Sequence, residues 1–410
     1  MRPGLRLVIG CVLACGLDAA VVAAEPAAPV TFLDRLAEAP AVQAARQRVH
    51  AAHRGEGAAG RLADPMLSAG LSQRSTAAEA WPIYEVMVEQ ALPRWGERDA
   101  RRMKALAESG FMAAELQDVL GETAAEVASM IAEAEAARAK TTLLEGQITR
   151  ASTLKASLDA RIASGSAGLG EQLAVQSRIA ALTVERDTSR RQVADAEEEV
   201  RARLGLEVNE ALPSFAAPVA TAVDPERIPG VLLARAKGGE SAAMLQEAQA
   251  SRSPETSIGL RYEREEVPTE PMDTIGLQVR VSLPVWRGAS DDLEESARFR
   301  QRAARRDEAA ARAKARSLVG RAERAATVAA SARAAAQSTQ GRLDAEYASL
   351  IRTAAIQGTG LMPVLEVLDR LGEAEFQVIE AEAAARQAAA SLWRLAPPVP
   401  AQLPAERVQP

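Results

Sequence analysis

Aromatic side chains are scarce in this sequence, where Phe, Trp and Tyr together make up 3% of 410 residues. A compact domain normally fills much of its core with such side chains, because each of them buries a large apolar area. Alanine, glutamate, arginine, leucine and glutamine are instead abundant, which is typical of long, closely packed helices. The scarcity of aromatic residues therefore argues against ordinary globular domains and favours extended helices.

Cysteine is nearly absent. The sequence contains only Cys11 and Cys15, and both lie in the apolar stretch 7–17. A basic start, a short apolar stretch and small residues after it are typical of an export signal. We expect residues 1–24 to be removed, which leaves the mature chain without a disulfide. The run Val12-Leu13-Ala14-Cys15 also resembles a lipoprotein processing box, which would leave Cys15 as a lipidated N-terminus.

Catalytic and metal-binding side chains are scarce as well. His50 and His53 are the only histidines, and two histidines without cysteine or a nearby acid pair make a poor metal site. The sequence contains no phosphate-binding glycine loop of the expected form. A net charge of −6 gives no support for a nucleic-acid partner. We expect no enzyme activity, no cofactor, no metal site and no nucleic-acid partner.

Long hydrophobic runs are missing after the export signal, so no membrane-spanning helix is expected. Four segments instead alternate between apolar and polar residues, at 66–72, 83–92, 257–262 and 274–283. Both pairs of segments end in a Leu-Pro-x-Trp pattern, at 92–95 and at 283–286. In the last segment Leu277 and Val279 lie opposite Gln278, which predicts strands with one apolar face and one polar face.

A strand of about ten residues can cross an outer membrane when it is tilted. Four strands cannot close a barrel of useful bore, and an open sheet edge in lipid would leave backbone groups without hydrogen bonds. We therefore expect several copies of the chain to contribute strands to one barrel. Aromatic belts mark the two interfaces of such barrels. The candidate interface residues are Trp81, Tyr84, Trp95, Tyr262 and Trp286.

The rest of the chain predicts two long helical hairpins. Two glycine breaks lie at 165–170 and 358–360. About 70 residues precede each break, and as one helix each stretch would reach roughly 100 Å. Returning helices are expected at about 171–204 and 361–395, with further helical pieces at about 32–60 and 226–252.

The chain is therefore predicted to be an α+β membrane protein. It would combine a long antiparallel α-helical coiled-coil barrel with a four-stranded contribution to an oligomeric transmembrane β-barrel. Two internal strand-strand-helix-helix repeats are expected at 25–213 and 214–397, before a disordered proline-rich tail at 398–410.

These features together resemble the TolC-like family of outer-membrane efflux proteins. The resemblance covers nearly the whole mature chain. It rests on the doubled plan, the Leu-Pro-x-Trp exits and residues 360–369, which are similar to the family's glycine-led helix tip. It implies a homotrimer in the outer membrane that extends into the periplasm and works with a periplasmic adaptor and an inner-membrane pump. Residues 95–101 are similar to the strand exit of the heavy-metal efflux branch, although Glu97 replaces its lysine.

The acids at the second hairpin tip are the candidate gate. Glu366 and Asp369 are three residues apart and share one helical face. In the resembled family, acids at the matching positions line the periplasmic constriction, where a ring of carboxylates attracts cations. The alternative is that both are solvated acids near a helix start, which the helix dipole favours. The first tip has Leu173 and Gln176 in the comparable region.

Glycines mark both hairpin tips, where an adaptor would make contact. These candidate contacts are Gly165, Gly168, Gly170, Gly358 and Gly360, although glycine also commonly ends helices for conformational reasons alone. The predicted function is an exit duct for small molecules or metal ions. A periplasmic adaptor or a secreted coiled-coil structural protein are the alternatives. An adaptor would carry one hairpin between β-rich halves, and a structural coiled coil would not need two alternating strand pairs.

Overall fold

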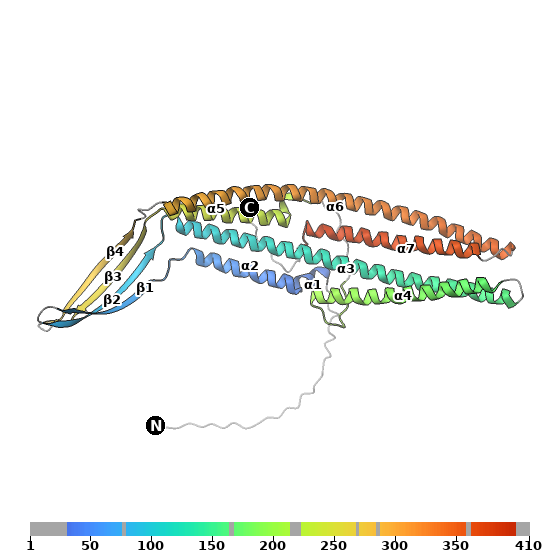
Figure 1. Ribbon diagram of the computed structural model, residues 1–410, viewed down its shortest axis with the longest axis horizontal. Helices are drawn as coiled ribbons and strands as arrows, with labels where there is room; N and C mark the ends of the chain where they lie inside the picture. Colours follow the sequence, from blue (N-terminus) through green and yellow to red (C-terminus); the bar gives the residue numbers. More distant parts are fainter. Residues whose placement is uncertain are drawn as a thin grey trace, which may run out of the picture.

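The protein is long and narrow, with a sheet at one end and helices along the rest (Figure 1). The computed structural model describes residues 31–75, 79–163, 168–213, 223–267, 270–283, 288–357 and 362–398. Helices dominate these residues, and the strands form one four-stranded antiparallel sheet. The expected export signal with Cys15, and also Gly165, Trp286, Gly358 and Gly360, lie outside the described residues.

The sheet joins strands from both halves of the chain. β1 (Met66–Ser75) pairs with β2 (Ala80–Leu92), and β3 (Glu255–Glu265) pairs with β4 (Met272–Ser282), as the alternating segments predicted. β2 also pairs with β3, although a whole helical hairpin separates them in the sequence. The strand order is β1-β2-β3-β4. Among the described residues, β1 and β4 therefore each have one neighbouring strand and one open edge.

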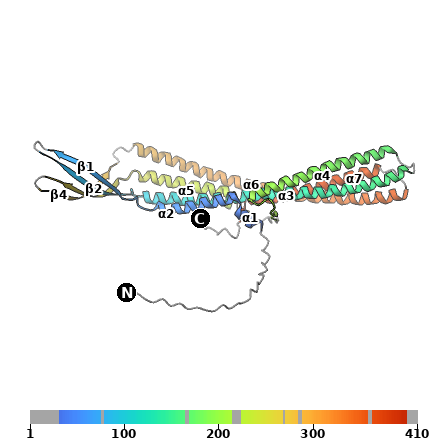
Figure 2. The same ribbon diagram turned by 90° about the horizontal axis from the view of Figure 1, so that it is seen from below.

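Two helices run the length of the helical part. α3 (Glu97–Ala163) and α6 (Gly288–Gln357) contain 67 and 70 residues, which corresponds to about 100 Å at the rise of an α-helix. α4 (Leu169–Leu204) and α7 (Met362–Ser391) return part of the way. The two hairpins end together, opposite the sheet (Figure 1 and Figure 2). The glycine breaks in the sequence predicted these hairpins correctly.

Shorter helices lie between the ends of α4 and α7 and the sheet. They are α1 (Phe32–Glu38), α2 (Pro40–Ala59) and α5 (Pro229–Ala250). The single helical piece expected at 32–60 is divided in two. Pro40 explains the division, because proline lacks an amide hydrogen and suits only the first turn of a helix.

The helices form one layer rather than a compact bundle. α3 contacts α2 and α4 as well as α5 and α7, and α6 packs against α5 and α7. Across the layer the order is α2 and α4, then α3, then α5 and α7, then α6 (Figure 1). Such a layer leaves both of its broad faces exposed. None of the described helices is long and apolar enough to cross a membrane.

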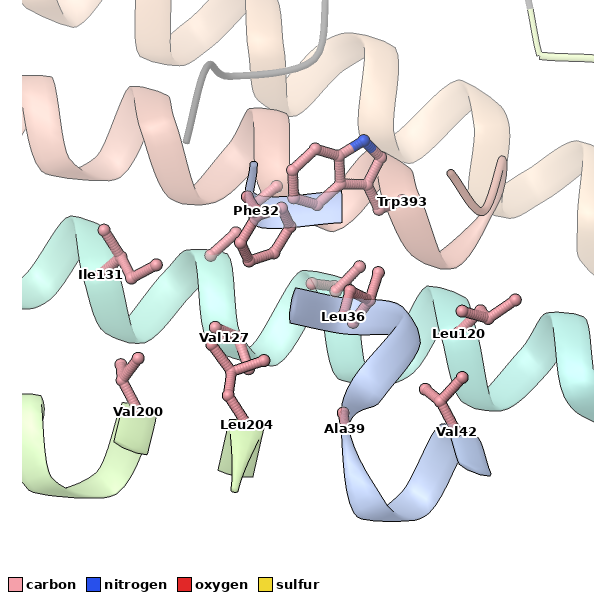
Figure 3. Packing of buried hydrophobic residues seen from close by; sticks show 14 residues of the cluster. Phe32, Leu36, Ala39, Val42, Leu120, Val127, Ile131, Val200, Leu204 and Trp393 are labelled. Atoms are coloured by element: carbon pink, nitrogen blue, oxygen red, sulfur yellow. The ribbon is translucent and has the colours of Figure 1, made fainter. Parts of the chain in front are cut away.

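An apolar core lies midway along the layer, where α1 and the ends of α4 and α7 meet α3 (Figure 3). Phe32 stacks on Trp393 with ring centroids 5.2 Å apart. Gly121 of α3 lies so close to the turn after α7 that an added methyl group would come within 2.6 Å of the carbonyl oxygen of Trp393. α4 ends at Gly205, whose φ of 66° is left-handed, and Pro40 packs against that glycine. The core thus joins the hairpins to the short helices.

Candidate functional site

One face of the sheet is apolar and exposed. The strand registers place the same face of all four strands together. This apolar face contains Leu67, Ala69, Leu71, Tyr84, Val86, Val88, Ile258, Leu260, Tyr262, Ile275, Leu277, Val279 and Val281. Leu71, Ile275 and Leu277 are 72%, 75% and 75% exposed. A continuous exposed apolar patch of this extent marks a surface that meets another apolar phase or a partner.

Polar groups bound the apolar face at the end away from the helices. Arg264 and Asp273 lie opposite each other on this face, 3.9 Å apart. The hydroxyl of Tyr262 donates a hydrogen bond to Asp273 at 2.8 Å. β4 has 11 residues in all, with Asp273 near its start, and a tilted strand of about this length can cross an outer membrane. The strand length, with a polar boundary at one end, therefore suits a sheet that crosses a membrane.

The opposite face of the sheet carries charged side chains joined by ion pairs between strands. Arg280 of β4 lies 2.8 Å from Glu89 of β2. Arg261 of β3 lies 3.0 Å from Glu85 of β2 and also pairs with Glu263. Burying a charged side chain in an apolar phase costs much free energy, so such side chains lie in water or beside a partner of opposite charge. The sheet therefore separates an apolar surface from a polar one, as the alternation predicted.

Trp81 lies on this polar face, apart from the tyrosines. Its indole N–H donates to Glu265 Oε1 at 2.6 Å, and Arg74 Nη1 donates to the same oxygen at 2.8 Å. Trp81 was predicted to belong to an aromatic belt at the membrane interface, but this position makes it part of a cross-strand hydrogen-bond cluster. Strand alternation contained the signal, because Trp81 is an even number of residues from Glu85 and Glu89.

The other described aromatic candidates are exposed. Tyr84 and Tyr262 lie on the apolar face, where they are 45% and 38% exposed. Trp95 lies between β2 and α3 and is 89% exposed. An exposed indole between an apolar sheet and a polar helix layer suits a membrane interface, and that role stays a prediction for these three residues.

The candidate gate lies on α7, toward the end of the molecule opposite the sheet. The side chains of Glu366 and Asp369 are 65% and 54% exposed. Arg370 lies 2.6 Å from Glu366 on the same helix, and Arg178 of α4 lies 2.8 Å from Asp369. The first turn of α7 contains no acid, and both side chains are solvated, so the gate stays a prediction beside its alternative. Arg178 was not predicted, because no local pattern links α4 to α7.

The first hairpin tip has a different set of polar contacts. Gln172 and Lys155 donate to Asp159 at 2.7 and 3.2 Å. The hydrogen bond from Gln172, followed by the one from Lys155, lowers the pKa of Asp159. Gly168 precedes α4 in an extended conformation, and Gly170 lies in its first turn. An added methyl group would meet nothing within 4 Å at either glycine, so both positions border open space. Their contact with an adaptor stays a prediction.

The two histidines lie on α2, and the contacts of His53 are ordinary. Its Nδ1 lies 3.2 Å from Glu56 Oε1 and 3.1 Å from Ser109 Oγ. In the part of the chain that the structure describes, no three His, Cys, Asp or Glu side chains gather where they could hold a metal ion.

Comparison with known proteins gives matches at the level of structure. No protein-family model and no curated protein matches the chain. A membrane protein from Pseudomonas aeruginosa is similar with a TM-score of 0.75 at 16% identity, over 88% of this chain and 92% of that one. The open-state MtrE outer-membrane channel of Neisseria gonorrhoeae is similar with a TM-score of 0.73 at 14% identity, over 88% and 87% of the two chains. The outer-membrane protein VceC of Vibrio cholerae gives 0.72 at 16% identity, over 88% and 94%.

These likenesses identify the fold. The chain has the fold of outer-membrane channels, with a small antiparallel sheet at the end of long helical hairpins. More narrowly, this is the TolC-like fold, which the sequence resemblance predicted.

Proposed function

We propose that the chain is one protomer of an outer-membrane exit duct that exports small molecules or metal ions. The observation that carries the proposal is the exposed apolar face of a sheet with two open edge strands. Lipid cannot satisfy the hydrogen bonds of a strand edge, so both edges must pair with further copies of the chain. Four strands from each of three copies would make the twelve-stranded barrel of a homotrimer.

The same arrangement gives the rest of the molecule a role. The polar face of the sheet would line a water-filled lumen, and the helical layers would continue the wall into the periplasm. A periplasmic adaptor and an inner-membrane pump would then engage the hairpin tips. A periplasmic adaptor or a structural coiled coil, the two alternative functions, would have no need of a sheet with an exposed apolar face.

We further propose that Glu366 and Asp369 form the periplasmic gate. Both side chains are more than half exposed near the tips, so three copies could bring them around one opening. Asp369 also pairs with Arg178 of the other hairpin, so the acid is placed to couple the positions of the two tips. Mutual repulsion in such a ring would favour a bound multivalent cation.

Single-channel recording in a planar bilayer tests both proposals. The wild type should conduct, and a trivalent cation on the periplasmic side should block the current more strongly than a monovalent one. Replacing Glu366 and Asp369 by Ala should weaken the block about tenfold or more, because it removes the carboxylates that bind the cation. The matched control is the double Ala variant of Glu373 and Glu380, two exposed acids farther along α7.

The outcomes separate the duct from the gate. A wild type that forms no channel would contradict the exit-duct proposal. If the wild type conducts, and the trivalent cation blocks it and the Glu366 and Asp369 double variant equally, only the gate proposal is contradicted.

A further inference from the structure

Two arginines of α3 lie over the end of α2, and a third follows that end in the chain. Arg98 Nε donates to the carbonyl oxygen of Gly60, just after α2, at 2.7 Å. A methyl group added at Gly60 would come within 2.5 Å of Arg102 Nε, so the side chain of Arg102 lies over the same glycine. Arg61 follows Gly60 directly in the chain. We call Arg61, Arg98 and Arg102 the arginine corner.

The arginine corner is not neutralised by neighbouring acids. All three residues are exposed, and none forms an ion pair with a described residue. Glu97, the acid next to Arg98, pairs with Arg101 instead. Asp64 and Asp99 are close in the sequence, but neither pairs with the corner among the described residues. A guanidinium carries five N–H donors, so most donors of the corner face solvent.

The arginine corner borders the apolar face of the sheet. Gln90 lies on that face and donates to the carbonyl oxygen of Ala63 at 2.8 Å. The segment that follows Arg61 therefore passes along the apolar side of β2. Leu62 and Leu67, which flank this segment, are 51% and 69% exposed. Unpaired positive charge thus lies beside exposed apolar surface, at the end of the sheet nearest the helices.

The equivalent corner in the second half of the chain has no such feature. Arg252, just after α5, pairs with Asp291 and lies 2.8 Å from Glu294, both on α6. When the two Leu-Pro-x-Trp patterns are aligned, the two α3 arginines of the corner correspond to Ala289 and Leu293. The fold therefore forms this corner without unpaired arginines. A cation near Gly60 would stabilise the C-terminus of α2 through the helix dipole, and Arg98, which donates to the carbonyl oxygen of Gly60, is enough for that role.

We propose that the arginine corner binds the phosphate of an anionic phospholipid in the inner leaflet of the outer membrane. The guanidinium fork matches two oxygens of a phosphate group. A headgroup held there would let its acyl chains lie along Leu62, Leu67 and the apolar face. The inference rests on the proposed outer-membrane position, because only then does this end of the apolar face reach the inner-leaflet headgroups.

Calorimetric titration of the full-length protein in neutral detergent tests the proposal. The probes are short-chain phosphatidylglycerol and short-chain phosphatidylcholine. Phosphatidylglycerol should bind about tenfold or more tightly than phosphatidylcholine, since each arginine near an anionic headgroup strengthens binding severalfold. The double variant Arg98→Gln and Arg102→Gln should lose that preference. Arg252→Gln, which removes an arginine already paired with acids, should keep it.

A second variant and a third probe make the test decisive. Arg61→Gln changes only an exposed side chain after α2, so it tests the proposal even if the double variant fails to fold. It should lower the phosphatidylglycerol affinity severalfold. Inorganic phosphate should bind more weakly than phosphatidylglycerol, because it lacks acyl chains.

Equal binding of the two lipids, or unchanged binding by both variants, would overturn the proposal. Phosphate binding as tight as the lipid would overturn the lipid assignment. Conductance of the same wild-type preparation reports separately on the exit duct.

Discussion

At the residue scale, neighbouring positions of one strand face opposite environments. Leu277 and Gln278 are adjacent on β4, and their partners on β3 are Leu260 and Gly259. Leu277 is 75% exposed on the apolar face. Leu277→Arg should cost about 2–4 kcal/mol, because it would place a charge near the membrane midplane, and should reduce the yield of assembled protein in membranes. Gln278→Arg points to the polar face and should assemble normally. Similar yields for the two variants would mean that positions 277 and 278 are assigned to the wrong faces of the sheet.

Glu197 of α4 links the first hairpin through acid-sensitive contacts. The hydrogen bond from Arg138 of α3 is the largest cause that lowers the pKa of Glu197, and Arg201 adds to it. Because the folded state depresses this pKa, the contacts stabilise the fold above the pKa of the unfolded chain. That stability is lost as the pH falls through the lower pKa of the folded state.

Glu197→Gln should therefore lower the melting temperature at pH 7 more than at about pH 3. The change in the free energy of unfolding should stay within about 1 kcal/mol, because the ion pair is partly exposed. Thermal unfolding followed by circular dichroism between these pH values measures the effect. Glu198→Gln is the matched control, since Glu198 is an exposed neighbour. A pH-independent difference between wild type and Glu197→Gln would contradict the assigned cause.

At the element scale, α3 packs closely against the turn after α7 in the apolar core midway along the helices. Gly121→Ala should destabilise the protein by about 1–3 kcal/mol, since the new methyl group would meet backbone that cannot move alone. Gly110→Ala changes a glycine of the same helix that has nothing within 4 Å, and it should be neutral or stabilise by up to about 1 kcal/mol. Urea unfolding of both variants measures the difference. Equal stability of the two variants would show that α3 and the turn after α7 can move apart without cost.

The elements themselves could largely be predicted from the sequence. α3 and α6 begin soon after the Leu-Pro-x-Trp patterns and run to the glycine breaks, since neither helix contains a proline. The break between α1 and α2 was missed, although Pro40 signals it. Trp81 was grouped with the interface aromatics on its residue type alone, and its position in the alternation, which places it on the polar face, was not used.

At the scale of the whole molecule, the open edges of β1 and β4 require partners. We expect protein extracted in mild detergent to migrate as a trimer on an unheated gel and as a monomer after heating, because barrel closure satisfies every edge hydrogen bond. It should fractionate with the outer membrane. Recovery as a soluble monomer without detergent would contradict both the assembly and the membrane position.

Local order is what the sequence by itself determined. Period-two alternation set the faces of the strands, and proline and glycine set the ends of most helices, because both signals act between residues close in the chain. Only the tertiary structure decided which distant elements meet. Three contacts join residues from separate elements. They are the pairing of β2 with β3, the ion pair of Arg178 with Asp369, and the contact of Arg98 and Arg102 with Gly60. No local pattern encodes such contacts, since they depend on how the long helices stack and where each of them ends.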